Sequence, residues 1–343
     1  MCSKLFMAAG IALAASCASM NTIETTQLPP IPDAAYAKGV SAPFCGVIGE
    51  TLVVAGGANF PGKSLLEGGA KRVYADIWAF SDGRWSHAGV LPDSTAYGAT
   101  FQVPGGLVFA GGNICCSTTD KVYKVSLSDG NSIVTPLPAL PVPMEQCGWS
   151  SNEGILFLAG REGVFCCREG EYVWKKLADI PEPLLQPVAF ASGGKLFLWG
   201  GFNPQTLLAP PDGHCLNLET LGWESAPAVP DGGTFVGATG ATLPDGRLAV
   251  VGGVNRAIFE RALRNTPEDR IPYLSKEPAE YKFRSEVFVF GSQKLEWSSL
   301  GTCPETALAG PGVAASPDGG LFVAGGELKP GVRSPIILNI FIK

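Results

Sequence analysis

Six short apolar runs, each ending in a pair of small residues, recur along the chain, and this repetition limits the fold more than any other feature. The runs are apolar at successive positions, as expected of a strand that is flanked by other strands and buried on both faces. The glycines that follow allow the chain to turn tightly where backbones crowd together. The second residues of the six pairs are Gly57, Gly112, Gly160, Gly201, Gly253 and Gly326, and Ala159 replaces the first glycine of the third pair.

A second landmark lies between the runs, where a tryptophan stands seven residues before a proline. The pairs are Trp85 and Pro92, Trp174 and Pro181, Trp223 and Pro230, and Trp297 and Pro304, with Val134 in the tryptophan position before Pro141. The apolar runs recur about every 50 residues, which is the period of kelch-type blades. The sequence therefore predicts an all-β fold, a six-bladed kelch-type β-propeller, with five outer strands visible for six repeats.

The sixth outer strand is expected at the other end of the chain. Thr25 stands seven residues before Pro32, in the same register as the tryptophans. We therefore expect a segment near residues 22–32 to complete the last blade, which would remove the exposed edge of an open ring. A Pro-rich linker is the alternative for this segment.

An insertion at about residues 254–284 interrupts the repeats in blade five. Ile258, Phe259 and Leu263 have helical spacing. Two interpretations are open: a solvated helix that covers the fifth blade, which we favour because periodicity alone does not indicate a lid, and a lid over a central pocket.

The N-terminus reads as a signal for export. Residues 1–16 have a basic start at Lys4 and an apolar run that is too short to span a bilayer, which predicts a signal peptide before a propeller at 17–343. Cys17 follows Leu13 to Ser16 in a pattern similar to a bacterial lipobox, so we expect a periplasmic protein, with a membrane anchor if Cys17 is lipidated. Cleavage beside an incidental cysteine is the alternative.

Charge and cysteine content limit the partners and cofactors that we expect. The net charge of -6 gives no basic footprint, so nucleic acid is not an expected partner. The chain has no CxxC pair and two histidines, so no metal site is expected, and no phosphate-binding loop indicates a cofactor. Eight cysteines follow Cys17, and some could pair as disulfides in an oxidising compartment.

Loops that converge near the propeller axis supply the candidate binding residues. Turn geometry alone accounts for asparagines at such positions, but it does not require an acid or a base. The first polar residues after the six glycine turns are Asn59, Asn113, Arg161, Asn203, Asn255 and Glu327. A second ring, five residues after each outer-strand proline, comprises Ala37, Tyr97, Gln146, Gln186, Phe235 and Ala309. A polar cavity of this kind suits a small hydroxylated ligand.

Three motifs stand out near the glycine turns: GGANFPG at 56–62, which contains Asn59 and Phe60, AYG at 96–98, which contains Tyr97, and GGELKPGVRS at 325–334. They resemble those of the sialic acid mutarotases, also called N-acetylneuraminate epimerases. In familiar members the GExKPGxR motif precedes GGANF, whereas here it follows, so the chain looks like a cyclically permuted branch. The resemblance spans essentially all of the mature chain.

The resemblance implies an acid–base pair at Glu327 and Arg333 and a reaction that interconverts the α and β anomers of N-acetylneuraminate or a related sugar. Ring opening needs a base at the anomeric hydroxyl and a donor at the ring oxygen, and each proton transfer contributes about 10²–10⁴-fold in rate. Glu327 would carry the proton, and Arg333 would hold the substrate carboxylate and keep Glu327 ionised. A surface ion pair is the alternative for these residues, and a non-catalytic propeller that binds a sugar or protein is the alternative function.

Overall fold

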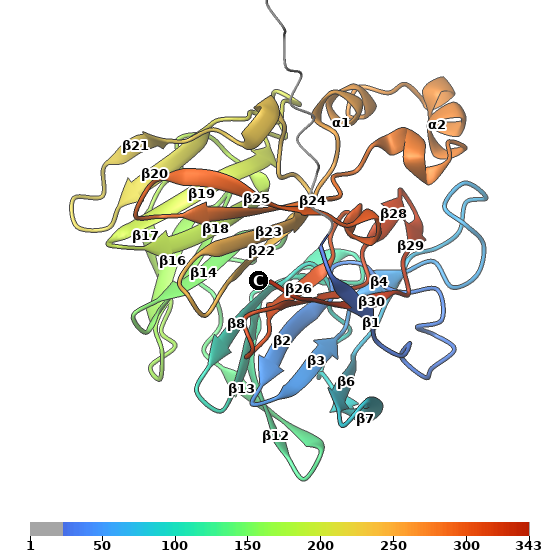
Figure 1. Ribbon diagram of the computed structural model, residues 1–343, viewed down its shortest axis with the longest axis horizontal. Helices are drawn as coiled ribbons and strands as arrows, with labels where there is room; N and C mark the ends of the chain where they lie inside the picture. The colour runs from blue at the N-terminus through green and yellow to red at the C-terminus, as the bar shows by residue number, and fades with distance from the viewer. Residues whose placement is uncertain (1–22, 343) are drawn as a thin grey trace, which may run out of the picture.

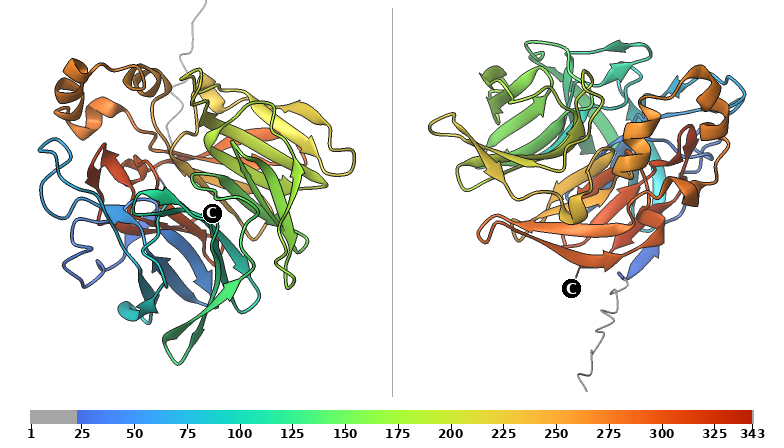
Figure 2. Two further views of the ribbon diagram at one scale, coloured as in Figure 1. Left: turned by 180° about the vertical axis from the view of Figure 1, so that it is seen from behind. Right: turned by 90° about the horizontal axis from the view of Figure 1, so that it is seen from above.

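The computed structural model describes residues 23–342 as six four-stranded antiparallel sheets arranged around a central axis (Figure 1). The predicted signal peptide at 1–16 and Cys17 lie outside the described residues. The innermost strands of neighbouring sheets contact each other around the axis, and the two further views show the sheets radiating from it (Figure 2). The predicted six-bladed β-propeller is confirmed.

Each blade is an antiparallel meander that runs from the axis outward. The strands are, in that order, β2 (Phe44–Ile48), β3 (Thr51–Ala55), β6 (Asp76–Ser81) and β7 (Arg84–Val90) in blade one; β8 (Ala99–Val103), β9 (Gly106–Ala110), β12 (Val122–Ser128) and β13 (Asn131–Leu137) in blade two; β14 (Gly148–Asn152), β15 (Ile155–Gly160), β16 (Gly163–Arg168) and β17 (Lys175–Ala178) in blade three; β18 (Leu185–Ser192), β19 (Lys195–Phe202), β20 (Gly213–Asn217) and β21 (Trp223–Ala226) in blade four; β22 (Ala238–Thr242), β23 (Leu248–Gly252), β24 (Glu286–Gly291) and β25 (Glu296–Thr302) in blade five; and β26 (Gly312–Ala315), β27 (Leu321–Ala324), β30 (Ile337–Ile340) and β1 (Thr25–Gln27) in blade six.

Short elements decorate the loops between these strands. Three two-stranded hairpins are β4 (Ala58–Asn59) with β5 (Arg72–Val73), β10 (Asn113–Ile114) with β11 (Ser117–Thr118), and β28 (Glu327–Lys329) with β29 (Val332–Arg333). Two 3₁₀ turns, η1 (Pro230–Gly232) and η3 (Pro304–Thr306), follow the outer strands of blades four and five.

The outer strand of blade six comes from the N-terminal end of the described chain. In β1, Thr26 stands opposite Asn339 of β30, and the Leu28 N–H donates to the Ile337 carbonyl at 2.8 Å. The two strands lie side by side although they come from opposite ends of the sequence (Figure 1). The predicted closure of the ring near residues 22–32 is confirmed, and the linker alternative is set aside.

The repeated glycine runs are the second strand of each blade, one step away from the axis. The glycine that ends each run lies where two blades meet. At Gly325, φ is +65° and a Cβ atom would stand 2.2 Å from the Val40 carbonyl oxygen, so a side chain cannot be accommodated. In blade three β15 continues through Gly160 into a tight hairpin with β16, which explains why Ala159 is tolerated there.

The hydrophobic core is divided into six layers, one between each pair of neighbouring blades. The recurring spacing of tryptophan and proline places side chains between neighbouring blades. The Trp85 indole N–H of blade one donates to the Pro29 carbonyl of blade six at 2.7 Å. The Trp223 indole of blade four donates to the Asp179 carbonyl of blade three at 2.9 Å. Each of these outer-strand tryptophans therefore fastens its blade to the chain that follows the preceding outer strand.

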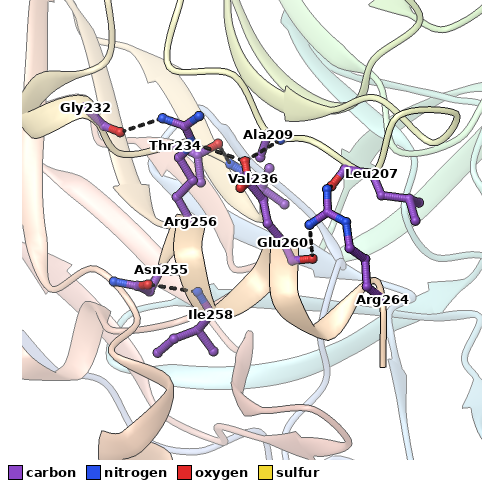
Figure 3. A network of polar contacts seen from close by, with 10 residues as sticks. All are labelled: Leu207, Ala209, Gly232, Thr234, Val236, Asn255, Arg256, Ile258, Glu260 and Arg264. Carbon is purple, nitrogen blue, oxygen red and sulfur yellow. Dashed lines mark hydrogen bonds and ion pairs between the residues drawn. The ribbon is translucent and has the colours of Figure 1, made fainter. Parts of the chain in front are cut away.

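The insertion in blade five forms α1 (Arg256–Ala262), α2 (Pro267–Leu274) and the 3₁₀ turn η2 (Pro278–Tyr281). Asn255 caps α1, since its side-chain oxygen accepts a hydrogen bond from the Ile258 N–H at 3.1 Å. Glu260 accepts the Ala209 N–H at 3.0 Å, and Arg264 donates to the Leu207 carbonyl at 3.0 Å (Figure 3). These contacts fix α1 to a loop of blade four.

The eight cysteines among residues 23–342 are all free thiols, so the expected disulfides are not found in this part of the chain. Burial raises the pKa of the Cys45 and Cys147 thiols to about 12, which makes both unreactive at neutral pH. Within the same described range, no helix is long and apolar enough to cross a membrane.

Candidate active site

A ring of six residues in the left-handed conformation surrounds the propeller axis, one at the entrance to each blade, with φ between 50° and 72°. Five of the six successive pairs are joined by a hydrogen bond from N–H to carbonyl, as from Tyr97 to Ala42 at 3.0 Å and from Gln186 to Gln146 at 2.7 Å. The left-handed conformation is unfavourable for non-glycine side chains and often marks a functional site. The ring consists of Ala42, Tyr97, Gln146, Gln186, Gly237 and Gly310.

A cavity of about 230 Å³ lies on this ring, and all six ring residues line it. The volume lies just below the range of about 300–1,000 Å³ that is usual for small-molecule pockets, so the cavity suits a small ligand. Among the lining residues there is no lysine or arginine, and Glu327 is the single charged side chain. The cavity therefore combines one carboxyl group with amides, phenols and apolar surface.

Trp149 forms the floor of the cavity. The residues three positions after the ring members face a second, lower compartment along the axis. Five of these residues are small or medium in size, and Trp149 alone also lines the upper cavity. Its indole therefore separates the two compartments. The residues at this level are Cys45, Thr100, Trp149, Ala189, Gly240 and Val313.

Glu327 and Arg333 stand directly opposite each other in the β28–β29 hairpin. The turn between them contains Gly331, whose φ of +84° suits glycine. Opposite residues on antiparallel strands bring their side chains together, so a separation of six residues in sequence becomes a contact. Arg333 Nη1 lies 2.7 Å from Glu327 Oε1. The motif spacing is therefore explained by the hairpin.

The two members of this ion pair have different environments. The Arg333 side chain is 3% exposed, and its Nε donates to the Ala58 carbonyl at 3.1 Å. Its guanidinium carbon lies 5.3 Å from the centre of the Phe60 ring, a cation–π contact. The Glu327 side chain is 25% exposed and lines the cavity, whereas Arg333 does not. Arg333 therefore contacts Glu327 on the side that faces away from the cavity.

Burial raises the pKa of Glu327, and the positive charges of Arg333 and Lys71 oppose this shift. A carboxyl group with a raised pKa exchanges its proton more readily near neutral pH than an exposed one. The backbone of Glu327 is held firmly, because its N–H donates to the Ala309 carbonyl at 2.6 Å. Position and protonation both suit a group that moves a proton.

Two glutamines form an amide pair at the cavity wall. Gln186 Nε2 donates to Gln146 Oε1 at 2.9 Å, which leaves further donor and acceptor positions of both amides for a ligand. Tyr97 lies beside them in the ring, and Lys71 Nζ stands 4.8 Å from the centre of its aromatic ring. These three predicted residues are at the cavity, as is the capping residue Asn255.

Asn255 and Glu327 also follow glycine turns, but the other predicted residues after these turns do not line the cavity. Asn59 is fully buried and bonds to Ala35, Gly39 and Tyr74. Asn203 closes its own turn and donates to Glu182. Arg161 is half exposed in the β15–β16 turn, paired with Glu162 at 2.6 Å. Asn113 pairs through its backbone with Ala96, and Phe60 packs beneath Arg333.

The second predicted ring coincides with the left-handed ring in blades two, three and four, but not in the other three blades. Ala37 is exposed in a turn, and Phe235 is buried in the layer between blades four and five. Ala309 lines the cavity but stands one residue before the ring position. The loops after Pro32, Pro230 and Pro304 are longer than the others, so a fixed offset from the proline does not reach Ala42, Gly237 and Gly310.

The insertion supplies one wall of the cavity. Our favoured interpretation, a helix that only covers blade five, is too narrow, because both α1 and the chain after it line the cavity. Helical periodicity identifies an inward face without telling what that face contacts. The insertion residues at the cavity are Ile258, Phe259, Tyr273, Tyr281 and Phe283.

Residues 23–342 contain no group of three or more histidine, cysteine or acidic side chains placed to hold a metal ion. The cavity is lined by carboxyl, phenol and amide groups of the chain.

The fold and the site together define a six-bladed kelch-type propeller with a small cavity on its axis. The chain belongs to the N-acetylneuraminate epimerase family, whose model matches residues 12–134 and 166–343. The family resemblance read from the motifs is thus confirmed, whereas cyclic permutation stays a prediction.

Relatives named N-acetylneuraminate epimerase are similar over part of their length. One from Yersinia pestis (strain Pestoides F) is 28% identical over 229 residues, which cover 60% of this chain and 58% of the relative. One from Yersinia enterocolitica serotype O:8 / biotype 1B is 30% identical over 181 residues, 48% of this chain and 45% of the relative. One from Vibrio vulnificus (strain YJ016) is 38% identical over 115 residues, 31% and 30% of the two chains. The chain thus spans less than two thirds of each.

Proposed function

We propose that the protein is a mutarotase that interconverts the α and β anomers of N-acetylneuraminate or a closely related sugar acid. The observation that carries this proposal is Glu327, a carboxyl group with a raised pKa that lines an axial cavity and is held by a buried arginine. Membership of the N-acetylneuraminate epimerase family supports the class of substrate.

In the proposed reaction the Glu327 carboxylate removes the proton of the anomeric hydroxyl. The bond between the anomeric carbon and the ring oxygen breaks, and the ring oxygen takes a proton from a donor. Rotation of the open chain followed by closure returns both protons and gives the other anomer. Arg333 serves as a positioning residue that fixes the carboxylate, since its guanidinium is too deeply buried to meet the substrate without a rearrangement.

Time-resolved proton NMR tests the proposal. A sialidase releases N-acetylneuraminate as the α anomer, and the appearance of the β anomer is followed without protein, with the native chain, and with Glu327→Gln. Glu296→Gln, which neutralises an exposed carboxylate on β25, is the matched control. We expect acceleration by the native chain and by the control, and its loss in Glu327→Gln.

An unchanged rate with the native protein would remove this activity. Binding of the sugar without acceleration would instead support the alternative, a propeller that binds a sugar without catalysis. A melting curve of each variant separates loss of chemistry from loss of fold.

We also propose that the chain is exported and that Cys17 carries a lipid, on the sequence pattern alone. Cell fractionation and labelling with a radioactive fatty acid, compared between the full chain and Cys17→Ser, test both points. Equal labelling of the two chains would exclude lipidation at Cys17, and a chain found only in the cytoplasm would exclude export.

A further inference from the structure

The proposed reaction needs a proton donor for the ring oxygen, and Arg333 does not line the cavity. The described side chains at the cavity that carry an ionisable O–H are Tyr97, Tyr273 and Tyr281. The Tyr281 hydroxyl already donates to the Tyr273 carbonyl. Tyr97 belongs to the ring on the blade-two side. Tyr273 is therefore the remaining candidate for the proton donor that works with Glu327.

Tyr273 and Glu327 are brought together by a tie between two separate segments. Tyr273 lies in the last turn of α2, and Glu327 begins β28. Lys329, in the same hairpin as Glu327, donates from Nζ to the Lys276 carbonyl just after α2, at 2.6 Å. The insertion and the β28–β29 hairpin therefore meet at the cavity (Figure 1).

The Tyr273 ring is held in place by its own segment. The Tyr281 ring packs against it edge-on, with centroids 5.2 Å apart and planes at 74°. α2 itself begins with a capping box between Thr266 and Asp269. Among residues 23–342 the Tyr273 hydroxyl has no hydrogen-bond partner, and its electrostatic interactions are with Tyr281 and Glu327. The hydroxyl is therefore available to a ligand.

The charges around Tyr273 keep it protonated. Burial, the Tyr281 phenol and the Glu327 carboxylate raise the pKa of Tyr273 to about 12. Below that value Tyr273 retains its proton and can donate it. A sugar alkoxide released by ring opening is a stronger base than a phenolate, so transfer from Tyr273 to that oxygen is favourable even with a raised pKa.

We propose that Tyr273 is a second catalytic residue, which protonates the ring oxygen while Glu327 removes the proton of the anomeric hydroxyl. This inference rests on the proposed mutarotase function. On ring opening the electron pair of the broken C–O bond goes to the ring oxygen, which takes the Tyr273 proton. The anomeric C=O forms as Glu327 takes the hydroxyl proton, and closure on the other face reverses both transfers. The insertion thereby supplies half of the acid–base chemistry.

Tyr273→Phe tests the inference, because it removes the hydroxyl and keeps the ring that packs on Tyr281. We expect kcat to fall by about 10²-fold, as for the loss of one general acid, with KM changed less than about threefold. Tyr123→Phe, which removes a phenol bonded to Asp93 far from the cavity, is the control and should retain full activity. The split between kcat and KM is the readout that a merely structural role would not give, because a distorted cavity would raise KM as well.

The outcomes distinguish the two proposals. A native chain without acceleration contradicts the mutarotase function itself. An active native chain together with Tyr273→Phe at nearly native kcat overturns the role of Tyr273 and leaves the function standing. If Tyr273→Phe does not fold, 3-fluorotyrosine at position 273 lowers the phenol pKa with little change in its packing. The value of kcat should then change while KM stays close to that of the native chain, and an unchanged kcat contradicts the inference.

Discussion

Arg333 and Glu327 form an ion pair of 2.7 Å in which only the acid reaches the cavity. The arginine is enclosed by the Ala58 carbonyl and the Phe60 ring, so the position of the carboxylate is set by a group that solvent does not reach. This one-sided arrangement has consequences for stability as well as for catalysis.

Glu327→Gln should lower the free energy of unfolding by about 3 kcal/mol, because it leaves the buried Arg333 charge without its partner. The double variant Glu327→Gln/Arg333→Met should regain part of this loss, since the unpaired charge is removed as well. Urea denaturation of both single variants and the double variant measures the coupling between the residues. If the losses in free energy of the two single variants simply add in the double variant, the ion pair itself does not stabilise the fold.

Lys71→Gln should move the acidic limb of the kcat/KM profile to higher pH. Glu327 must be ionised to accept a proton, so activity rises as the pH passes the pKa of this carboxyl group. Burial raises that pKa, and Lys71 lowers it, so removing the Lys71 charge raises it further. Lys63→Gln, an exposed lysine in the same loop, is the control. A shift in the opposite direction, or equal shifts in both variants, would contradict this assignment.

Gln146→Leu should raise KM by about 2- to 12-fold with little change in kcat, as expected for one lost neutral hydrogen bond. The amide pair with Gln186 lies at the cavity wall, so the loss affects binding more than proton transfer. Gln102→Leu, at the lower compartment, offers the matched comparison and should leave KM unchanged. A normal KM for Gln146→Leu would place the sugar elsewhere in the cavity.

Trp149→Ala should join the upper cavity to the lower compartment. The sugar would lose an aromatic platform contributing about 1 kcal/mol, so KM should rise several-fold. Trp149→Phe should keep the floor and much of the affinity. A crystal structure of Trp149→Ala that still shows two separate compartments would disprove the assignment of Trp149 as the partition.

Thr26→Pro should lower the melting temperature more than Thr25→Pro. Leu28 donates its N–H to β30, and the two-residue period of the ladder places the Thr26 N–H on the same side. The Thr25 N–H points away from β30, where proline is tolerated on an edge strand. Thermal unfolding of the two variants makes the comparison. Equal melting temperatures would show that pairing with β30 does not stabilise the fold.

Much of the fold could be predicted because two independent landmarks repeat. The glycine pairs and the tryptophan–proline spacing both reflect the meeting of neighbouring blades, so Thr25 could be matched to Trp85 across the whole chain. A periodic feature of sequence is easily read when it recurs in most of the blades.

The site was harder to predict because it depends on differences between blades. Tyr97, Gln146 and Gln186 were found where loop length is constant, and Gly237 was missed where it is not. Trp149 follows Gln146 by three residues, so its place at the axis could have been read once the ring was known. Tyr273 had no such signal, because the insertion has no counterpart in the other blades.

The pairing of β1 with β30 also means that the ring can close only after both ends of the propeller have been synthesised. β1 is the first and its partner β30 the last of the strands among residues 23–342. Before β30 is synthesised, β1 has no partner strand. Blades one to five can then form, but blade six cannot close the ring. Contacts between such distant segments form slowly and expose unpaired edges to aggregation meanwhile. The three residues of β1 therefore close the ring late in folding. The incomplete propeller is most prone to aggregate with other chains before that closure.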